Sequence, residues 1–145
     1  MIALIQRVSH ANVVVSNSEI AQINKGLLVL LGVSKGDDAA KADKLVHRML
    51  GYRVFEDTEG KMNLSVKDVG GEILLVPQFT LAADTKSGMR PGFSTAAPPE
   101  EGVFWFDYVA GKCKKTLGKV QLGEFGADMK VGLLNDGPVT FWLET

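Results

Sequence analysis

The sequence of 145 residues has few of the side chains that most enzymes use for nucleophilic or metal chemistry. It contains 1 cysteine and 2 histidines, which excludes an internal disulfide and a cysteine-rich zinc site. Its formal net charge is -1, which excludes a broad basic surface for nucleic acid. No apolar run approaches the ~20 residues of a membrane-spanning helix, and the N-terminus has no signal-peptide pattern. We therefore expect a reduced, cytoplasmic protein with no membrane contact, no metal and no other cofactor.

The composition that is present is globular and rich in glycine. Hydrophobic residues make up 46% of the chain and charged residues 23%, as in ordinary folded domains. The 16 glycines exceed the usual share of about 7% and indicate backbone positions with special geometry. Because the length is close to that of one typical domain, and such a chain needs no covalent staple, we interpret residues 1–145 as a single domain.

Apolar patterns predict a β-rich chain with two main helices. Residues 26–33 are apolar on both sides of any pleat, which is typical of a strand covered on two faces. Asp37 or Asp38 can cap a first helix, and a second helix is expected from Pro99 until Gly118 ends it. The predicted strands are 2–8, 12–15, 19–23, 26–33, 52–55, 73–81, 119–122, 128–134 and 139–143, and the first helix ends near residue 50. This order indicates a mixed-sheet α/β domain.

The usual catalytic residue sets are missing. His10 and His47 do not accompany a Gly-x-Ser-x-Gly motif, and we interpret both as residues without a catalytic role. Cys113 falls on the apolar face of the predicted second helix, where burial is a better explanation than use as a nucleophile. Backbone chemistry remains, because residues 77–80 and 135–140 place polar groups at strand ends. Main-chain N–H groups there could stabilise a developing oxyanion.

Two further features suggest a site without proving one. Gly137-Pro138 is a candidate cis peptide bond, because the cis form of an X–Pro bond costs only ~0.5–1 kcal/mol. Such a bond would turn two successive carbonyls to one side, although an ordinary turn explains the same residues. The long polar segment 82–98 is a predicted loop, and loops of this length are often functional.

Several motifs in the same order make the chain resemble the D-aminoacyl-tRNA deacylase family over essentially its whole length. They are Gln6-Arg7-Val8, 26–33 (GLLVLLGV), 60–63 (GKMN), 75–84 (LVPQFTLAAD), Arg90-Pro91, 125–129 (FGADM) and 135–140 (NDGPVT). The resemblance implies a homodimeric enzyme that binds the 3′ end of aminoacyl-tRNA. It would hydrolyse the ester between a D-amino acid and the terminal adenosine.

The resemblance places the reacting ester at one short segment. Gln78, Phe79 and Thr80 would lie at the scissile ester, with a main-chain N–H near Phe79 stabilising the oxyanion. No side chain would act as the nucleophile, because the ribose 2′-hydroxyl of the tRNA would help to activate water. This agrees with the scarcity of histidine and cysteine.

The resemblance also implies how the enzyme would select a D-amino acid. Gly137 and Pro138 would enter the pocket of the partner subunit, bind the α-amino group of the substrate and collide with an L side chain. Arg7 would support the orientation of this motif, and Phe125 and Met129 would line the pocket of the terminal adenosine. Because glycine has no side chain to reject, we expect residual activity on glycyl-tRNA.

Two positions depart from the family pattern. Pro77 stands where the family usually has serine, so a hydroxyl and a backbone N–H are missing and a serine nucleophile is unavailable there. Gly92 stands where serine often follows Arg-Pro, and we expect only a local effect. Two alternatives follow from Pro77: a deacylase with a shifted substrate range, or a non-catalytic dimer that binds tRNA 3′ ends or a protein.

Overall fold

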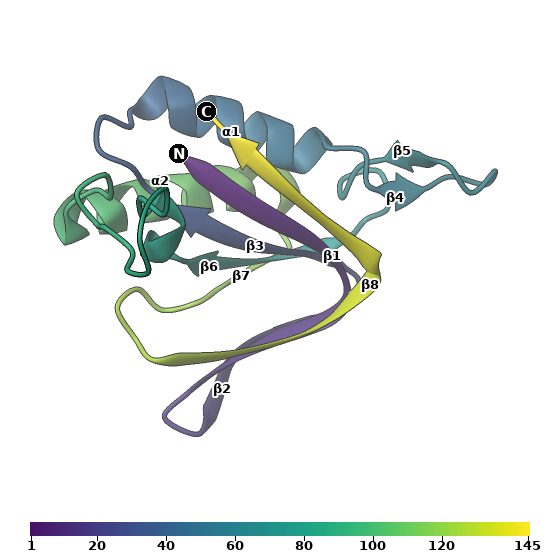
Figure 1. Ribbon diagram of the computed structural model, residues 1–145. Helices are drawn as coiled ribbons and strands as arrows, with labels where there is room; N and C mark the ends of the chain where they lie inside the picture. The colour runs from purple at the N-terminus through teal and green to yellow at the C-terminus, as the bar shows by residue number, and fades with distance from the viewer.

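The computed structural model describes all 145 residues, as one mixed sheet of six strands with two helices on one face (Figure 1). The strands of this sheet are β1 (Ile2–Val15), β2 (Ser18–Ile23), β3 (Gly26–Gly32), β6 (Glu72–Pro77), β7 (Val120–Leu122) and β8 (Met129–Glu144). They lie in the order β2-β1-β3-β6-β7, and β8 pairs with β1. β3, β6 and β7 are parallel, and the other pairs are antiparallel. The predicted mixed-sheet α/β fold is confirmed.

The two predicted helices are present, and they bury one face of the sheet. α1 (Ala39–Gly51) begins where the Asp38 side chain accepts a hydrogen bond from the Lys41 N–H at 2.9 Å. α2 (Pro99–Leu117) ends at Gly118, whose φ of 81° suits a residue without a side chain. The main core lies between these helices and β1, β3 and β6; its largest members include Ile5, Leu27, Leu31, Leu45, Met49, Leu50, Ile73 and Leu75. None of the helices is both long and apolar enough to cross a membrane.

The expected break between strands 2–8 and 12–15 is wrong, because β1 is one strand of 14 residues. Its first half pairs with β3 and its second half with β2, while β8 follows it along the other edge. Ser9 and His10 are exposed at the point where β1 changes neighbours. The strand bends there instead of ending.

The expected turn between strands 128–134 and 139–143 is also wrong. β8 is one strand whose pairing with β1 shifts from Gln6↔Thr140 to Val8↔Asn135. Residues 136–139 therefore oppose Arg7 alone, as a large bulge. The Gly137-Pro138 peptide bond within this bulge is cis.

The expected strand 73–81 ends early. β6 stops at Pro77, and Phe79–Ala82 form a 3-10 turn, η1. Gln78 donates its N–H to the Leu31 carbonyl at 2.8 Å, so the nitrogen of Pro77 faces the opposite edge of β6. The β6–β7 ladder has already ended there at Leu75↔Leu122, and proline costs this sheet no ladder bond.

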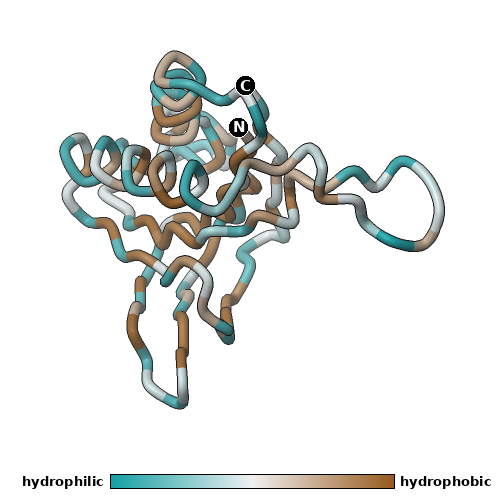
Figure 2. The backbone as a smooth tube through the Cα atoms, turned by 90° about the vertical axis from the view of Figure 1, so that its left-hand side faces the viewer, coloured by the Kyte–Doolittle hydropathy of each residue, from teal (hydrophilic) through white to brown (hydrophobic).

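A small hairpin stands outside the main sheet. β4 (Phe55–Glu56), which replaces the expected strand 52–55, pairs with β5 (Met62–Leu64), which was not predicted. The hairpin projects from the body of the protein (Figure 1). Hydrophobic residues are concentrated in the central sheet and on the sides of the helices that face it, whereas the residues of the projecting turns are mostly hydrophilic (Figure 2).

The second face of the sheet has no helix over it. On β1, Ala3 and Ile5 point into the core below the helices, and the intervening Leu4 points the other way. Leu4 pairs with Leu30 of β3 and with Trp142 of β8. These three residues form an apolar row across three strands, and Trp142 is 50% exposed.

Candidate active site

Gln78, Phe79 and Thr80 lie together at the point where β6 becomes η1. Phe79 is 56% exposed, and the Gln78 side-chain amide donates a hydrogen bond to the Thr80 hydroxyl. The first N–H groups of a helical turn have no acceptor within it, so those of Phe79 and Thr80 can bind a ligand. The predicted backbone donors are therefore available at an accessible strand end.

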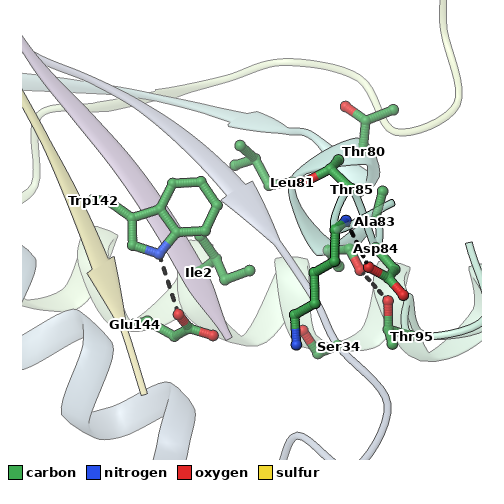
Figure 3. Close-up of a pocket in the computed structure, with 12 residues that line it drawn as sticks. Ile2, Ser34, Thr80, Leu81, Ala83, Asp84, Thr85, Thr95, Trp142 and Glu144 are labelled. Carbon is green, nitrogen blue, oxygen red and sulfur yellow. Dashed lines mark hydrogen bonds between the residues drawn. The ribbon is translucent and has the colours of Figure 1, made fainter. Parts of the chain in front are cut away.

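A large, open cavity borders this turn. It has a volume of about 530 Å³, and Thr80 and the residues that follow η1 form one side of it. Trp142 and Glu144 of β8 form the opposite side (Figure 3), where the indole N–H donates to the Glu144 carboxylate at 3.2 Å. The cavity is thus open to solvent between the end of β8 and the loop after η1.

Phe125 lies in a second, narrow hollow behind the same turn. Pro77, Phe79 and Gly102 also line this hollow. A methyl group on Gly102 would lie 3.0 Å from the Phe125 ring, so glycine allows the ring to pack against α2. The structure therefore brings Phe125 and Phe79 together from distant parts of the chain.

Met129 reaches the same region from the start of β8. Its sulfur accepts a hydrogen bond from the Glu124 N–H at 3.4 Å. A methyl group on Gly123 would lie 2.9 Å from that sulfur and 3.3 Å from Cδ of Pro77. The absence of a side chain on Gly123 thus lets Met129 approach Pro77.

The Arg7 side chain forms a hydrogen bond to the Gly137-Pro138 bulge. The guanidinium is buried, with 8% of the residue exposed. Its Nε donates to the Asp136 carbonyl at 2.8 Å, and its Nη1 donates to the Val54 carbonyl at 2.7 Å. Gly137 and Pro138 themselves are exposed. Arg7 therefore connects the bulge to the base of the β4–β5 hairpin.

Asn135 closes the bulge from its side. Its Oδ1 accepts from the Val139 N–H at 2.7 Å, and its Nδ2 donates to the Thr140 hydroxyl at 2.9 Å. These bonds replace the ladder contacts that the register shift removes. Sequence reasoning assigned no role to Asn135, although it belongs to the quoted NDGPVT motif.

Within one chain, the bulge and η1 are far apart. β8 contributes Trp142 and Glu144 to the cavity beside Thr80, but neither Gly137 nor Pro138 lines it. Glu144 pairs with Ile2, whereas the bulge lies opposite Arg7. The two positions on β1, Ile2 and Arg7, are five residues apart along the strand, or about 16 Å.

Comparisons with known proteins identify the family. The sequence model of D-Tyr-tRNA(Tyr) deacylase matches residues 4–144. The chain belongs to this family. It is 61% identical to D-aminoacyl-tRNA deacylase of Vibrio cholerae serotype O1 over 144 residues, 99% of both chains. It is 57% identical to D-aminoacyl-tRNA deacylase of Pectobacterium carotovorum over 145 residues, 100% of both chains.

Solved structures share the fold of this family member. The c-Myc DNA Unwinding Element Binding Protein superimposes with a TM-score of 0.96 at 40% identity, over 100% of this chain and 99% of that one. A probable eukaryotic D-amino acid tRNA deacylase superimposes with a TM-score of 0.82 at 16% identity, over 99% and 98% of the two chains. At that identity the second likeness concerns the fold alone.

Cys113 lies in the core of this deacylase-family chain, as expected. It is fully buried on α2, and burial raises the pKa of its thiol to about 12. His10 and His47 are both exposed. No group of three or more His, Cys, Asp or Glu residues is placed to hold a metal ion.

Proposed function

We propose that this protein hydrolyses the ester of D-aminoacyl-tRNA to free D-amino acid and tRNA, a chiral proofreading step in translation. The observation that carries the proposal is the family match over residues 4–144, which includes both η1 and the Gly137-Pro138 bulge. Residues 1–145 would act as one domain in the cytoplasm, where aminoacyl-tRNA is used.

The chemistry we propose takes place at η1. The N–H groups of Phe79 and Thr80 stabilise the oxyanion of the tetrahedral intermediate, and Gln78 holds the Thr80 hydroxyl in place. No side-chain nucleophile is needed, because the tRNA 2′-hydroxyl helps to activate water. The burial of Cys113 and the absence of a hydroxyl on Pro77 support a mechanism of this kind.

Chiral selection occurs between two subunits of a homodimer. The separation of about 16 Å along β1 keeps Gly137 and Pro138 away from Thr80 of their own chain, and their exposure lets them enter a partner. The row of the half-buried Leu4 and Leu30 and the exposed Trp142 supplies an apolar surface for such a dimer. Arg7 supports the motif through the Asp136 carbonyl.

The hollow lined by Phe125, with Met129 near it, receives the terminal adenosine. Phe125 lines this hollow together with Pro77 and Phe79, and Met129 approaches Pro77 across Gly123. A base can stack on the Phe125 ring when the hollow widens. The ester would then lie at η1.

The direct test compares D-tyrosyl-tRNA with L-tyrosyl-tRNA at catalytic enzyme concentration. We expect rapid loss of the D ester and survival of the L ester, with the protein dimeric by light scattering. Thr80→Ala should slow hydrolysis, and Pro138→Ala should reduce the D/L preference more than it reduces binding. Equal loss of both esters, or an unchanged preference in Pro138→Ala, would contradict chiral selection by the bulge. Survival of both esters with retained binding would favour the non-catalytic alternative.

Glycyl-tRNA tests the steric basis of selection. A site that rejects an L side chain by collision has nothing to reject in glycine, so we propose residual hydrolysis of glycyl-tRNA. Parallel assays with D-tyrosyl-, glycyl- and L-tyrosyl-tRNA should place glycine between the other two. Glycyl-tRNA as stable with the protein as without it would contradict this explanation. A preference for other mischarged tRNAs would support the shifted substrate range suggested by Pro77.

A further inference from the structure

The loop that follows η1 is fixed at its base and free at its tip. Asp84 and Gly92 form a two-way backbone bridge, with N–H···O distances of 2.7 and 2.9 Å. Thr95 donates its hydroxyl to the Ala82 carbonyl at 2.6 Å. These hydrogen bonds close the base of the loop, which we call the neck, and residues 85–91 project from it beside the cavity at Thr80.

The tip of this loop carries positive charge without a partner. Lys86 and Arg90 are its only charged residues, and neither forms an ion pair. The nearby Asp84 carboxylate accepts a hydrogen bond from the Lys86 main-chain N–H at 3.0 Å and forms no ion pair with either cation. Lys86 also lines the cavity that Thr80 borders. In a chain of net charge -1, one cation without an ion pair thus lines the cavity of the proposed active site, and a second, Arg90, lies at the tip of the same loop.

An exposed aromatic ring, that of Phe93, follows this loop in sequence and lies beside η1 in space. Phe93, directly after the neck, lies with its ring centroid 5.4 Å from that of Phe79. Phe93 is 46% exposed and Phe79 is 56% exposed. A pair of accessible rings beside unpaired basic side chains is the combination that binds single-stranded nucleic acid, by base stacking and by contact with phosphates.

We propose that Phe93, Lys86 and Arg90 form a subsite for the single-stranded tRNA end just 5′ of the terminal adenosine. Phe93 stacks a base, and the two cations contact backbone phosphates. The subsite rests on the proposed deacylase function and deepens it, because it explains how a protein without a basic surface binds RNA. Binding energy from this remote part of the substrate would hold the ester at η1.

Two substrates separate this subsite from the active site. D-tyrosyl-tRNA has the phosphates and bases that the subsite would bind, whereas D-tyrosyl-adenosine has only the terminal nucleoside. We expect the double variant Lys86→Gln/Arg90→Gln to lower kcat/KM for the tRNA on the order of tenfold and to leave the adenosine ester unaffected. The slope of log kcat/KM against log salt should become shallower by about 1.4, or ~0.7 for each lost phosphate contact on a single strand.

Phe93 variants test stacking separately from charge. Phe93→Leu keeps an apolar contact with Phe79 but removes the ring face, so hydrolysis of the tRNA should fall on the order of tenfold. Phe93→Tyr keeps the ring and should retain nearly full activity. Neither variant should change hydrolysis of D-tyrosyl-adenosine or the salt slope.

A control variant with the same change in charge is available on α2. Lys114→Gln/Lys115→Gln also removes two exposed cations, and these lie outside the loop. This variant should change neither the hydrolysis of the two substrates nor the salt slope. An equal effect of the loop and control variants would overturn the subsite, because bulk charge would explain both. Equal losses on the tRNA and on the adenosine ester would also overturn it. If the unaltered protein hydrolysed neither ester, the proposed function would fail, and the subsite with it.

Discussion

The Nε atom of Arg7 donates a hydrogen bond to the carbonyl oxygen of Asp136 at 2.8 Å, across 129 positions of sequence. The same guanidinium donates to Val54 at 2.7 Å, so one buried side chain holds both the bulge of β8 and the base of the β4–β5 hairpin. A planar group with five fixed donors suits this double contact, and a lysine ammonium cannot reproduce it.

Replacing Arg7 should therefore cost both stability and selectivity. Arg7→Met leaves two carbonyls without their charged donor, and we expect the free energy of unfolding to fall by about 3 kcal/mol. Arg7→Lys should recover part of the stability and little of the D/L preference. Urea unfolding and the two tyrosyl esters measure these effects. Arg53→Met is the control, because Arg53 is exposed beside the same hairpin; a loss there as large as in Arg7→Met would contradict a specific role for Arg7.

Gly137 should not tolerate a side chain. Its φ is 143°, and an added methyl group would lie 2.6 Å from Cγ2 of Val139 and 3.2 Å from Nη2 of Arg7. We expect Gly137→Ala to reduce the free energy of unfolding by about 1–3 kcal/mol and to weaken the D/L preference. Gly111→Ala is a matched control, because no atom lies within 4 Å of the added methyl group. This change within α2 should stabilise the protein by about 0.5–1 kcal/mol, and thermal unfolding of both variants checks the opposite signs.

The sequence predicts the helices better than it predicts the site. The capping side chain of Asp38 and Gly118 at the end of α2 are local signals, and the structure confirms both. By contrast, the apolar run through Pro77 to Leu81 fits a strand as well as a helical turn, so periodicity alone could not identify η1. The bulge of β8 depends in part on a hydrogen bond from Arg7, 129 positions away, which no local pattern contains.

The resemblance brought together residues that lie far apart in the chain, and the structure shows how. Phe125 packs against α2, in the hollow that Phe79 also lines, because Gly102 has no side chain, and this packing could not be read from the sequence. Phe93 received no role from the sequence because its significance depends on its contact with Phe79. The one available signal was the unusual length of segment 82–98, which includes Phe93.

Cys113 should be chemically silent in the folded protein. Burial raises the pKa of its thiol to about 12, so at pH 8 only about one molecule in ten thousand would carry a thiolate. We expect no reaction with a disulfide reagent in native buffer and complete reaction in urea. The protein treated in native buffer should keep its full deacylase activity. Rapid labelling of the native protein, with loss of activity, would contradict a purely packing role.

The carboxylate of Asp57 should make the β4–β5 hairpin sensitive to acid. Hydrogen bonds from the Asn63 side chain and the Lys61 N–H lower the pKa of Asp57 below its ordinary value of 3.8. A lowered pKa contributes stability that is present above the ordinary value and is lost as the pH falls through the lower, folded-state value. Asn63→Ala removes the largest cause and should move the pKa of Asp57 upward. A carboxyl NMR titration of both proteins measures the change, and an identical midpoint would contradict the assigned cause.

Subunit mixing tests directly whether the bulge acts on the partner. Thr80→Ala removes the hydroxyl that Gln78 contacts in η1, and Pro138→Trp places a large ring where Pro138 would enter the partner's pocket; each variant alone should be much slower than the unaltered protein. In a mixed dimer, one site combines both defects, and the other combines an intact Thr80 with an intact Pro138. Refolding the two variants together in equal amounts should therefore restore about one quarter of the normal activity, since half of the dimers are mixed and each has one working site. A mixture as slow as its components would mean that Gly137-Pro138 serves its own chain, and the 16 Å separation along β1 would then need a large rearrangement of β8.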